Sequence, residues 1–308
     1  IDSINLNNAY CSIGNATFRN CNKMTKALIG DNITTIGDMA FAFCSSLQFI
    51  NSNNSVILPE NIETINTATF FNCKKLKGKI IIPRNVTSIN DQAFENCSAI
   101  HSIELSAKLQ QISISAFNKN NNFTRFLDSS NKYFSTYNGI LYSNDMNILY
   151  HCPQGYYGTC VVNSKTKIIN NYAFNSCTKI YHVILNHIEK INNYAFNGCT
   201  KLKKISLGKE IDSFNHKAFE GCQNLEYISI KKENQHLKSL DGIVYSADMK
   251  TLIYCPRAKQ GKIKIPKSVQ HIADYAFTGC NQITQIITHK NIKSIGKDAF
   301  TDTNLQIK

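Results

Sequence analysis

The chain lacks any apolar run of about 18 residues, the length that a helix needs to cross a membrane. It also lacks an initiator Met and a signal peptide, and it opens at Ile1 in the middle of a repeating pattern. We therefore interpret it as a mature fragment or an excised piece of a longer protein, with no membrane span in this fragment.

The common catalytic and metal-binding motifs are missing as well. There is no G-x-x-x-x-G-K-[ST], no G-x-G-x-x-G, no C-x-x-C and no H-E-x-x-H, so phosphate cradles and common zinc sites lack support. His182 and His187 form the closest His pair, but they flank an expected strand end, which favours opposite faces. We expect no enzyme activity, no catalytic residues, no metal and no cofactor.

What the sequence does have is one pattern written repeatedly. An Ile is followed five residues later by a Phe, then three residues later by a Cys, and then by a short apolar run. Phe214 alone replaces the Ile, while Asn120 and Thr303 replace the Cys, so we expect local irregularity at Asn120 and Thr303. The Phe column comprises Phe18, Phe41, Phe70, Phe94, Phe117, Phe174, Phe196, Phe219, Phe277 and Phe300.

A period near 23 residues is too short for an independent core, so each unit must bury its apolar side against its neighbours. Residues such as Leu202, Ile205 and Leu207 alternate as in a strand, and Ala218 and Phe219 follow Phe214 at near-helical spacing. The sequence predicts a solenoid of about 23 residues per unit, with a parallel β-sheet on one side and short helical turns on the other. We expect residues 1–308 to form a single domain with the Phe column in its core.

Two long Phe-to-Phe intervals contain a second kind of module. Residues 138–153 read NGILYSNDMNILYHCP, and residues 241–256 read DGIVYSADMKTLIYCP, at an offset of 103. Short apolar runs flanking polar residues are typical of a hairpin. We predict inserted β-hairpin modules at about 128–161 and 231–265, which either extend the sheet or stand out as a flap.

The cysteines divide into a column and a remainder. Those that follow the Phe residues share one position per unit, which favours buried thiols over disulfides, because neighbouring strands stay about 4.8 Å apart. Cys152 and Cys160 lie outside this column and could bridge.

The formal charge of +13 favours acidic partners, such as glycosaminoglycans or sialylated surfaces, through salt-sensitive steering. The alternative is that Lys reflects composition and only solvates the exterior. We expect no nucleic-acid partner, because basic and aromatic residues do not interleave as in single-strand binders. The Lys clusters are Lys74, Lys75, Lys77 and Lys79; Lys201, Lys203 and Lys204; and Lys231 and Lys232.

The strings IGDMAFAFCSSLQFI, INNYAFNGCTKLKKISL and IADYAFTGCNQITQII resemble the BspA-like, Treponema pallidum type of leucine-rich repeat over essentially the whole chain. The GILYS and YCP segments are also similar to an insertion common in that family. The resemblance implies a surface or secreted protein of a host-associated bacterium or protozoan parasite, with no catalytic residue in the repeat motif. The abundance of Asn and Lys is similar to that of a protozoan member.

Binding would then fall on the broad sheet face, where aromatic and basic side chains are expected to point outward. The alternative is that these are ordinary scattered apolar residues, which are normal on protein surfaces. We predict partner contacts at Phe49, Arg125, His182, Lys204, Tyr227 and Gln285, on a face that also presents Lys26, Leu28, Ser102, Glu104, Leu127, Ile184, Ser206, Ser229 and Ile287.

The resulting hypothesis is a non-enzymatic adhesion module at the cell surface or secreted, which attaches to a host cell-surface or extracellular-matrix protein or to acidic glycans. The alternative is an intracellular leucine-rich repeat scaffold for protein–protein interaction. A signal peptide or membrane anchor in the full-length gene would separate them. Because Phe300 lies eight residues before Lys308, we also expect either further chain or self-association through uncapped ends.

Overall fold

The computed structural model describes residues 1–127 and 130–303. The chain divides into two compact units, Ile1–Tyr156 and Tyr157–Lys308. Each unit is described by itself, and a single domain over residues 1–308 stays a prediction. Positions 128–129, where the first hairpin module was expected to begin, and 304–308, the expected end of the last unit, lie outside the described residues.

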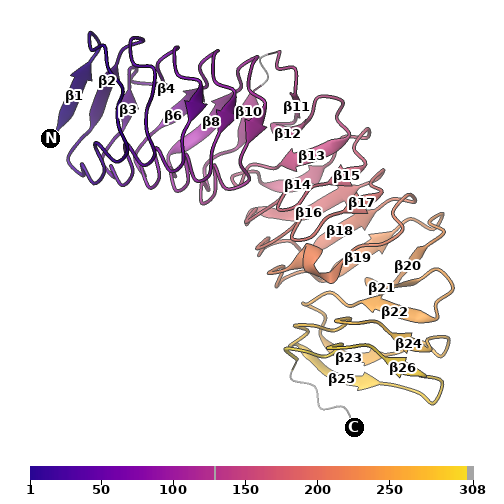
Figure 1. The fold of residues 1–308 in the computed structure, drawn as a ribbon. Helices are drawn as coiled ribbons and strands as arrows, with labels where there is room; N and C mark the ends of the chain where they lie inside the picture. Colours follow the sequence, from indigo (N-terminus) through magenta and orange to yellow (C-terminus); the bar gives the residue numbers. More distant parts are fainter. Residues whose placement is uncertain (128–129, 304–308) are drawn as a thin grey trace. The chain divides into compact units, whose positions relative to one another are not determined.

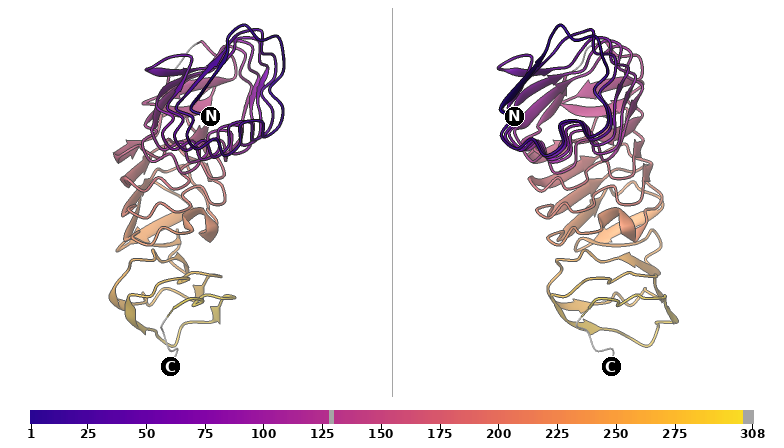
Figure 2. Two further views of the ribbon diagram at one scale, coloured as in Figure 1. Left: turned by 90° about the vertical axis from the view of Figure 1, so that its left-hand side faces the viewer. Right: turned by 60° about the vertical axis from the view of Figure 1, so that its left-hand side comes forward.

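The first unit is a stack of coils whose strands lie side by side in a common sheet, to which the long coil between Phe41 and Phe70 contributes two strands (Figure 1). Seen nearly along the stack, these coils form closed loops around their interior (Figure 2). The seven strands, in order across the sheet, are β1 (Ser3–Leu6), β2 (Lys26–Ile29), β3 (Phe49–Ile50), β4 (Ser55–Ile57), β6 (Gly78–Ile81), β8 (Ile100–Glu104) and β10 (Arg125–Leu127).

A second side of the first unit carries a shorter parallel ladder, and a hairpin sheet follows. The ladder consists of β5 (Thr64–Ile65), β7 (Ser88–Ile89) and β9 (Gln111–Ile112). The antiparallel hairpin strands are β11 (Phe134–Tyr137), β12 (Ile140–Ser143) and β13 (Ile148–His151), and they lie within the predicted range of the first module.

The second unit repeats this arrangement. Its first parallel sheet contains β14 (Gly158–Val161), β16 (Ile180–Leu185), β18 (Lys204–Leu207) and β19 (Tyr227–Ile230), and its short ladder contains β15 (Ile168–Ile169) and β17 (Lys190–Ile191). The second hairpin and the strands beside it are β20 (Leu237–Leu240), β21 (Ile243–Ser246), β22 (Thr251–Tyr254), β24 (His271–Ile272) and β26 (Ser294–Ile295), and a last parallel pair joins β23 (Gly261–Lys264) to β25 (Ile283–Ile287).

Alternation along each strand sends one set of side chains into the stack. Ile80 pairs with Ile103, and Ile103 with Phe126, and all three are almost completely buried. Full burial of such a side chain contributes about 1.5–3 kcal/mol, so the repeat in the sequence becomes a continuous core between coils. The predicted solenoid of about 23 residues per unit is confirmed.

The repeated Phe rings form a stack inside each unit. Consecutive rings from Phe18 through Phe41, Phe70 and Phe94 to Phe117 lie 5.2–5.8 Å apart between centroids and are inclined by no more than 25°. Offset stacking at this distance adds to the hydrophobic gain. The expectation that these rings are core is confirmed.

The prediction of short helical turns beside the Phe column is wrong for nearly every coil. Among the described residues the only helical segment is the 3-10 turn η1 (His216–Phe219). The backbone N–H groups of Phe41, Phe94 and Phe196 instead donate to carbonyls of the next coil at 2.9 Å. These turns therefore form a third ladder between coils, and left-handed residues such as Met39 and Phe43 give the backbone the necessary bends.

The column thiols are buried from Cys44 onward, as predicted, and Cys21 is half-buried. Cys160 is a buried free thiol, so the bridge to Cys152 that the sequence left open is not formed.

Candidate functional site

The sheet face of β14, β16, β18 and β19 carries a row of side chains in register. Thr159 pairs with His182, His182 with Lys204, and Lys204 with Tyr227. Adjacent parallel strands lie about 4.8 Å apart, so three of the six predicted contact residues are immediate neighbours. We call His182, Lys204 and Tyr227, together with Lys259, the basic–aromatic row.

Tyr227 is the centre of this row. Its ring centroid lies 5.8 Å from the Lys204 ammonium and 5.6 Å from the Lys259 ammonium, and the residue is 40% exposed. Its inner side packs on Gly242, where an added Cβ would lie 2.6 Å from the ring. The ring thus lies near two lysine ammonium groups and against the backbone of Gly242, and it remains partly open to solvent.

His182 lies at the other end of the row and is half-buried. Its Nε2 is 2.9 Å from the Ser206 hydroxyl, which also accepts a hydrogen bond from the Ser229 hydroxyl at 3.0 Å. Burial, and then the nearby Lys204 charge, lower the pKa of His182 below its ordinary value. The ring is therefore neutral near pH 7, and the lysines supply the positive charge of the row.

Phe49 and Arg125 lie on the sheet of the first unit, where β4, β6 and β8 separate their strands. Phe49 is half-buried, with the Lys77 ammonium 4.7 Å from its ring centroid. Arg125 is exposed and pairs with Ser102. Ser102, expected on the accessible face, is only 4% exposed because its short side chain stands between the longer Lys79 and Arg125 of the same row.

Gln285 is exposed on β25, which pairs with the adjacent strand β23 and places Gln285 opposite Lys262. It does not share a sheet with the basic–aromatic row in the described part of the chain. The structure thus brings together His182, Lys204 and Tyr227. Gln285 lies on another sheet of the same unit, and Phe49 and Arg125 belong to the first unit.

Sequence reasoning did not find Lys259. It follows the second hairpin module, and the N–H of the preceding Ala258 donates to the Leu225 carbonyl at 2.9 Å, which places this segment beside the start of β19. The alternation along a strand predicts only which residues of that strand share a face. It cannot place a loop residue such as Lys259, and no other feature of the sequence identifies this lysine.

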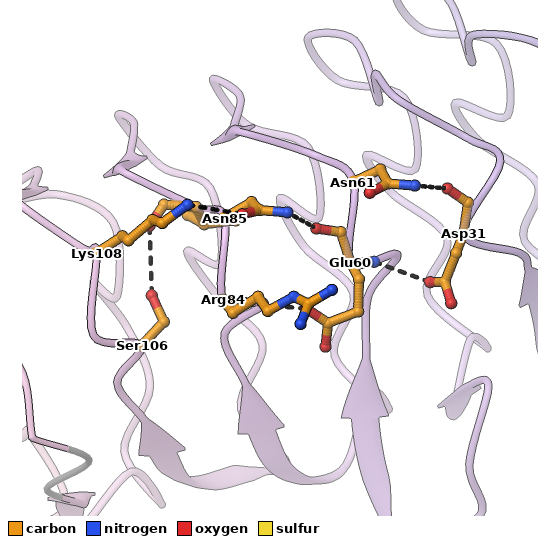
Figure 3. A network of polar contacts seen from close by, with 8 residues as sticks. Asp31, Glu60, Asn61, Arg84, Asn85, Ser106 and Lys108 are labelled. Atoms are coloured by element: carbon orange, nitrogen blue, oxygen red, sulfur yellow. Dashed lines mark hydrogen bonds and ion pairs between the residues drawn. The ribbon is translucent and has the colours of Figure 1, made fainter.

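A second polar arrangement runs along the corner after the strands of the first unit (Figure 3). The Asn61 side chain donates to the Asp31 carbonyl at 2.7 Å, and the Asn85 side chain donates to the Glu60 carbonyl at 2.9 Å. The Lys108 ammonium then donates to the Asn85 side chain at 3.0 Å. Because these groups satisfy one another from coil to coil, the network stabilises the stack.

Within the residues that the structure describes, no group of three or more His, Cys, Asp or Glu side chains is arranged to hold a metal ion. A search of the same residues finds no helix with the length and apolarity that a membrane crossing requires. What the basic–aromatic row can do chemically is bind: two ammonium groups and a fixed ring suit carboxylate, sulfate or an aromatic side chain.

Two solved bacterial structures share the fold of this chain. A leucine rich cell surface protein from Faecalibacterium prausnitzii A2-165 is 22% identical with a TM-score of 0.57, over 94% of this chain and 74% of that one. A leucine-rich repeat protein from Eubacterium ventriosum ATCC 27560 is 16% identical with a TM-score of 0.63, over 93% of this chain and 85% of that one. No curated protein matches the sequence.

The family comparison covers almost the entire chain. The model of the BspA type leucine rich repeat region matches residues 1–57, 49–150, 145–259 and 248–307. Proteins built from these repeats are generally binding modules and not enzymes. The repeat pattern, the stacked coils and this match agree that the chain belongs to the BspA type leucine rich repeat family.

Proposed function

We propose that this chain is a non-enzymatic adhesion module, at the cell surface or secreted, that binds an acidic region of a host cell-surface or extracellular-matrix protein. The observation that carries the proposal is Tyr227, an exposed ring on a sheet face with the ammonium groups of Lys204 and Lys259 at 5.8 and 5.6 Å from its centroid. Tyrosine is enriched among the residues that dominate binding energy in protein interfaces. Origin in a protozoan parasite belongs to the same proposal.

The charge of the whole chain supports this assignment. A formal charge of +13 accelerates association with an acidic partner, and the lysines beside Tyr227 then make short-range contacts. The solved relative from Faecalibacterium is described as a cell surface protein, which is the location that adhesion requires.

Binding to immobilised fibronectin, laminin and heparan sulfate, measured at about 50 and 300 mM NaCl, tests the proposal. We expect saturable binding to at least one of these ligands that weakens at high salt. The double substitution Lys204→Gln with Lys259→Gln should reduce affinity about thirtyfold or more, since each of the two lost contacts with a charged group is worth about 1 kcal/mol or more.

The matched control is Lys231→Gln with Lys232→Gln, which removes the same charge from two lysines directly after β19. If both double variants lose affinity equally, binding depends on net charge and the basic–aromatic row is not the site. Absence of binding to all three ligands by the folded protein would contradict the proposed class of partner.

A further inference from the structure

The two hairpin modules end in the same turn. In the second module the Lys259 N–H donates to the Pro256 carbonyl at 3.0 Å. In the first module the Tyr156 N–H donates to the Pro153 carbonyl at 2.9 Å. Tyr156 and Lys259 are separated by 103 residues, which is also the offset between the two module sequences. Tyr156 is therefore the counterpart of Lys259 in the first unit.

Each turn is attached to the coil that precedes its hairpin. The Gly155 N–H donates to the Phe123 carbonyl at 2.7 Å, and an added Cβ at Gly155 would lie 2.5 Å from that oxygen. In the second unit the Ala258 N–H donates to the Leu225 carbonyl at 2.9 Å. Phe123 stands two residues before β10, and Leu225 stands two residues before β19. The turn therefore lies beside the start of β10 in the first unit and beside the start of β19 in the second.

The first residues of these two strands also correspond. Arg125 begins β10, and Tyr227 begins β19. An added Cβ at Gly139 of the first hairpin would lie 2.7 Å from the Arg125 Cβ. The equivalent Cβ at Gly242 of the second hairpin would lie 2.6 Å from the Tyr227 ring. Arg125 therefore occupies in the first unit the place that Tyr227 occupies in the second.

The two units exchange the chemistry of these positions. In the second unit the strand supplies the ring of Tyr227 and the turn supplies the ammonium group of Lys259, 5.6 Å from the ring centroid. In the first unit the strand supplies the guanidinium group of Arg125, which is exposed, and the turn supplies the half-buried ring of Tyr156. Each unit thus places one cation and one aromatic ring where its hairpin meets the sheet.

The charges around Arg125 leave its guanidinium group available. Glu104 on the neighbouring strand β8 pairs with the Lys79 ammonium. Among the described residues no carboxylate forms an ion pair with Arg125. A guanidinium group presents a planar fork of N–H donors, which matches the two oxygens of a carboxylate. The surface at Arg125 therefore suits an acidic side chain.

We propose that Arg125 and Tyr156 form a second binding site for an acidic protein segment, so that one chain binds two such segments. Arg125 pairs with a carboxylate of the segment, and the Tyr156 ring packs against the apolar part of a neighbouring side chain. This inference rests on the proposed function, because it takes the class of ligand from the basic–aromatic row.

Fluorine NMR of the whole chain labelled with fluorotyrosine observes each site through its own ring. Tyr156→Phe and Tyr227→Phe assign the two resonances. The probe is a capped peptide of alternating glutamate and tyrosine, added at about 50 mM NaCl. Both resonances should shift saturably, while the resonance of Tyr10, which is 85% exposed and belongs to neither site, should stay in place.

Substitutions test whether the two sites bind independently. Arg125→Gln should weaken binding at Tyr156 about tenfold, the usual loss for a contact with a charged group, and should leave the other titration unchanged. Lys204→Gln with Lys259→Gln should have the opposite effect. Arg84→Gln is the matched control, because it removes the same charge from an exposed arginine of the first unit, and it should change neither titration.

The outcomes separate this inference from the proposed function. If Tyr227 responds to the peptide and Tyr156 does not, the second site is wrong and the proposed function stands. If Arg125→Gln and Arg84→Gln weaken binding at Tyr156 equally, the response follows net charge and the second site is again wrong. If neither ring responds, the acidic class of ligand is contradicted at both sites.

Discussion

Single residues explain why the repeat uses Cys. The thiols of Cys73, Cys97 and Cys199 donate to the carbonyl of the Phe one coil earlier, at 3.0–3.1 Å. Cys therefore fills a small apolar position and also satisfies a backbone acceptor between coils. The sequence indicated the column but offered no reason for a thiol where Ala would also fit.

Asn120 shows how far sequence reasoning reaches at this scale. Its place in the Cys column predicted a local irregularity, yet its side-chain nitrogen donates to the Phe94 carbonyl at 3.0 Å, as a column thiol would. The coil is nevertheless locally irregular, because the Asn120 N–H donates to the Gln154 side chain at 2.9 Å, whereas the N–H of Cys73 or Cys97 donates to the Phe three residues earlier. A residue-type pattern cannot show this equivalence, which depends on a contact between coils.

His151 should make the fold sensitive to acid. It is 6% exposed, its Nε2 has no partner among the described residues, and the Phe126 ring lies 5.7 Å away. Burial lowers its pKa from 6.5 to about 4. The folded protein favours the neutral ring, whereas the unfolded chain takes up a proton below pH 6.5. The free energy of unfolding is therefore highest above pH 6.5 and falls by about 3 kcal/mol as the pH drops towards 4.

The measurement is urea unfolding at several pH values between 7 and 4. His151→Leu should flatten the decline in the free energy of unfolding over this range, while His101→Leu removes an exposed imidazole and should not. A parent-like slope in the His151 variant would mean that another group controls acid unfolding.

At the scale of elements, the two hairpin modules dock on the last strand of the preceding sheet. The Phe126 N–H donates to the Gly139 carbonyl at 2.9 Å, and the Ile228 N–H donates to the Gly242 carbonyl at 3.1 Å. The sequence left open whether the hairpins extend the sheet or stand out as flaps. These bonds and the burial of β12 and β21 show that each hairpin continues the stack.

Gly242 is required where the hairpin crosses Tyr227. Its φ is +76°, and an added Cβ would lie 2.6 Å from the Tyr227 ring and 2.9 Å from its Cα. Gly242→Ala should therefore destabilise the protein by about 2–4 kcal/mol, from backbone strain together with a steric clash. It should also displace Tyr227 and weaken ligand binding at the basic–aromatic row.

Gly261 provides the control for this prediction. Its φ is +73°, but an added Cβ would meet no atom of the described residues within 4 Å. Gly261→Ala should cost only the backbone strain, about 1–2 kcal/mol. Chemical denaturation of the two variants separates backbone strain from the steric clash with Tyr227. Equal decreases in the free energy of unfolding would show that the contact with Tyr227 contributes little.

At the scale of the whole chain, the period and alternation were enough to predict the solenoid, because every coil repeats the same burial. The candidate sites were less predictable. Register follows from the repeat, so His182, Lys204 and Tyr227 could be aligned from sequence. Lys259 reaches its site from a segment outside the repeat, and only coordinates place it.

The stacking of coils also predicts how a destabilising substitution in one coil affects the stability of the others. Phe196 lies between Phe174 at 4.8 Å and Phe219 at 5.6 Å, and its N–H donates to the Ala218 carbonyl. Phe196→Ala should cost about 3–5 kcal/mol and remove support chiefly from the coils on either side, since each coil contacts only its neighbours. Hydrogen exchange should thus accelerate most in β16, β18 and β19 and least in β25 of the same unit. Uniform acceleration across all four strands would instead show that this unit opens as one cooperative body, in which the stability of a coil is not set by its immediate neighbours.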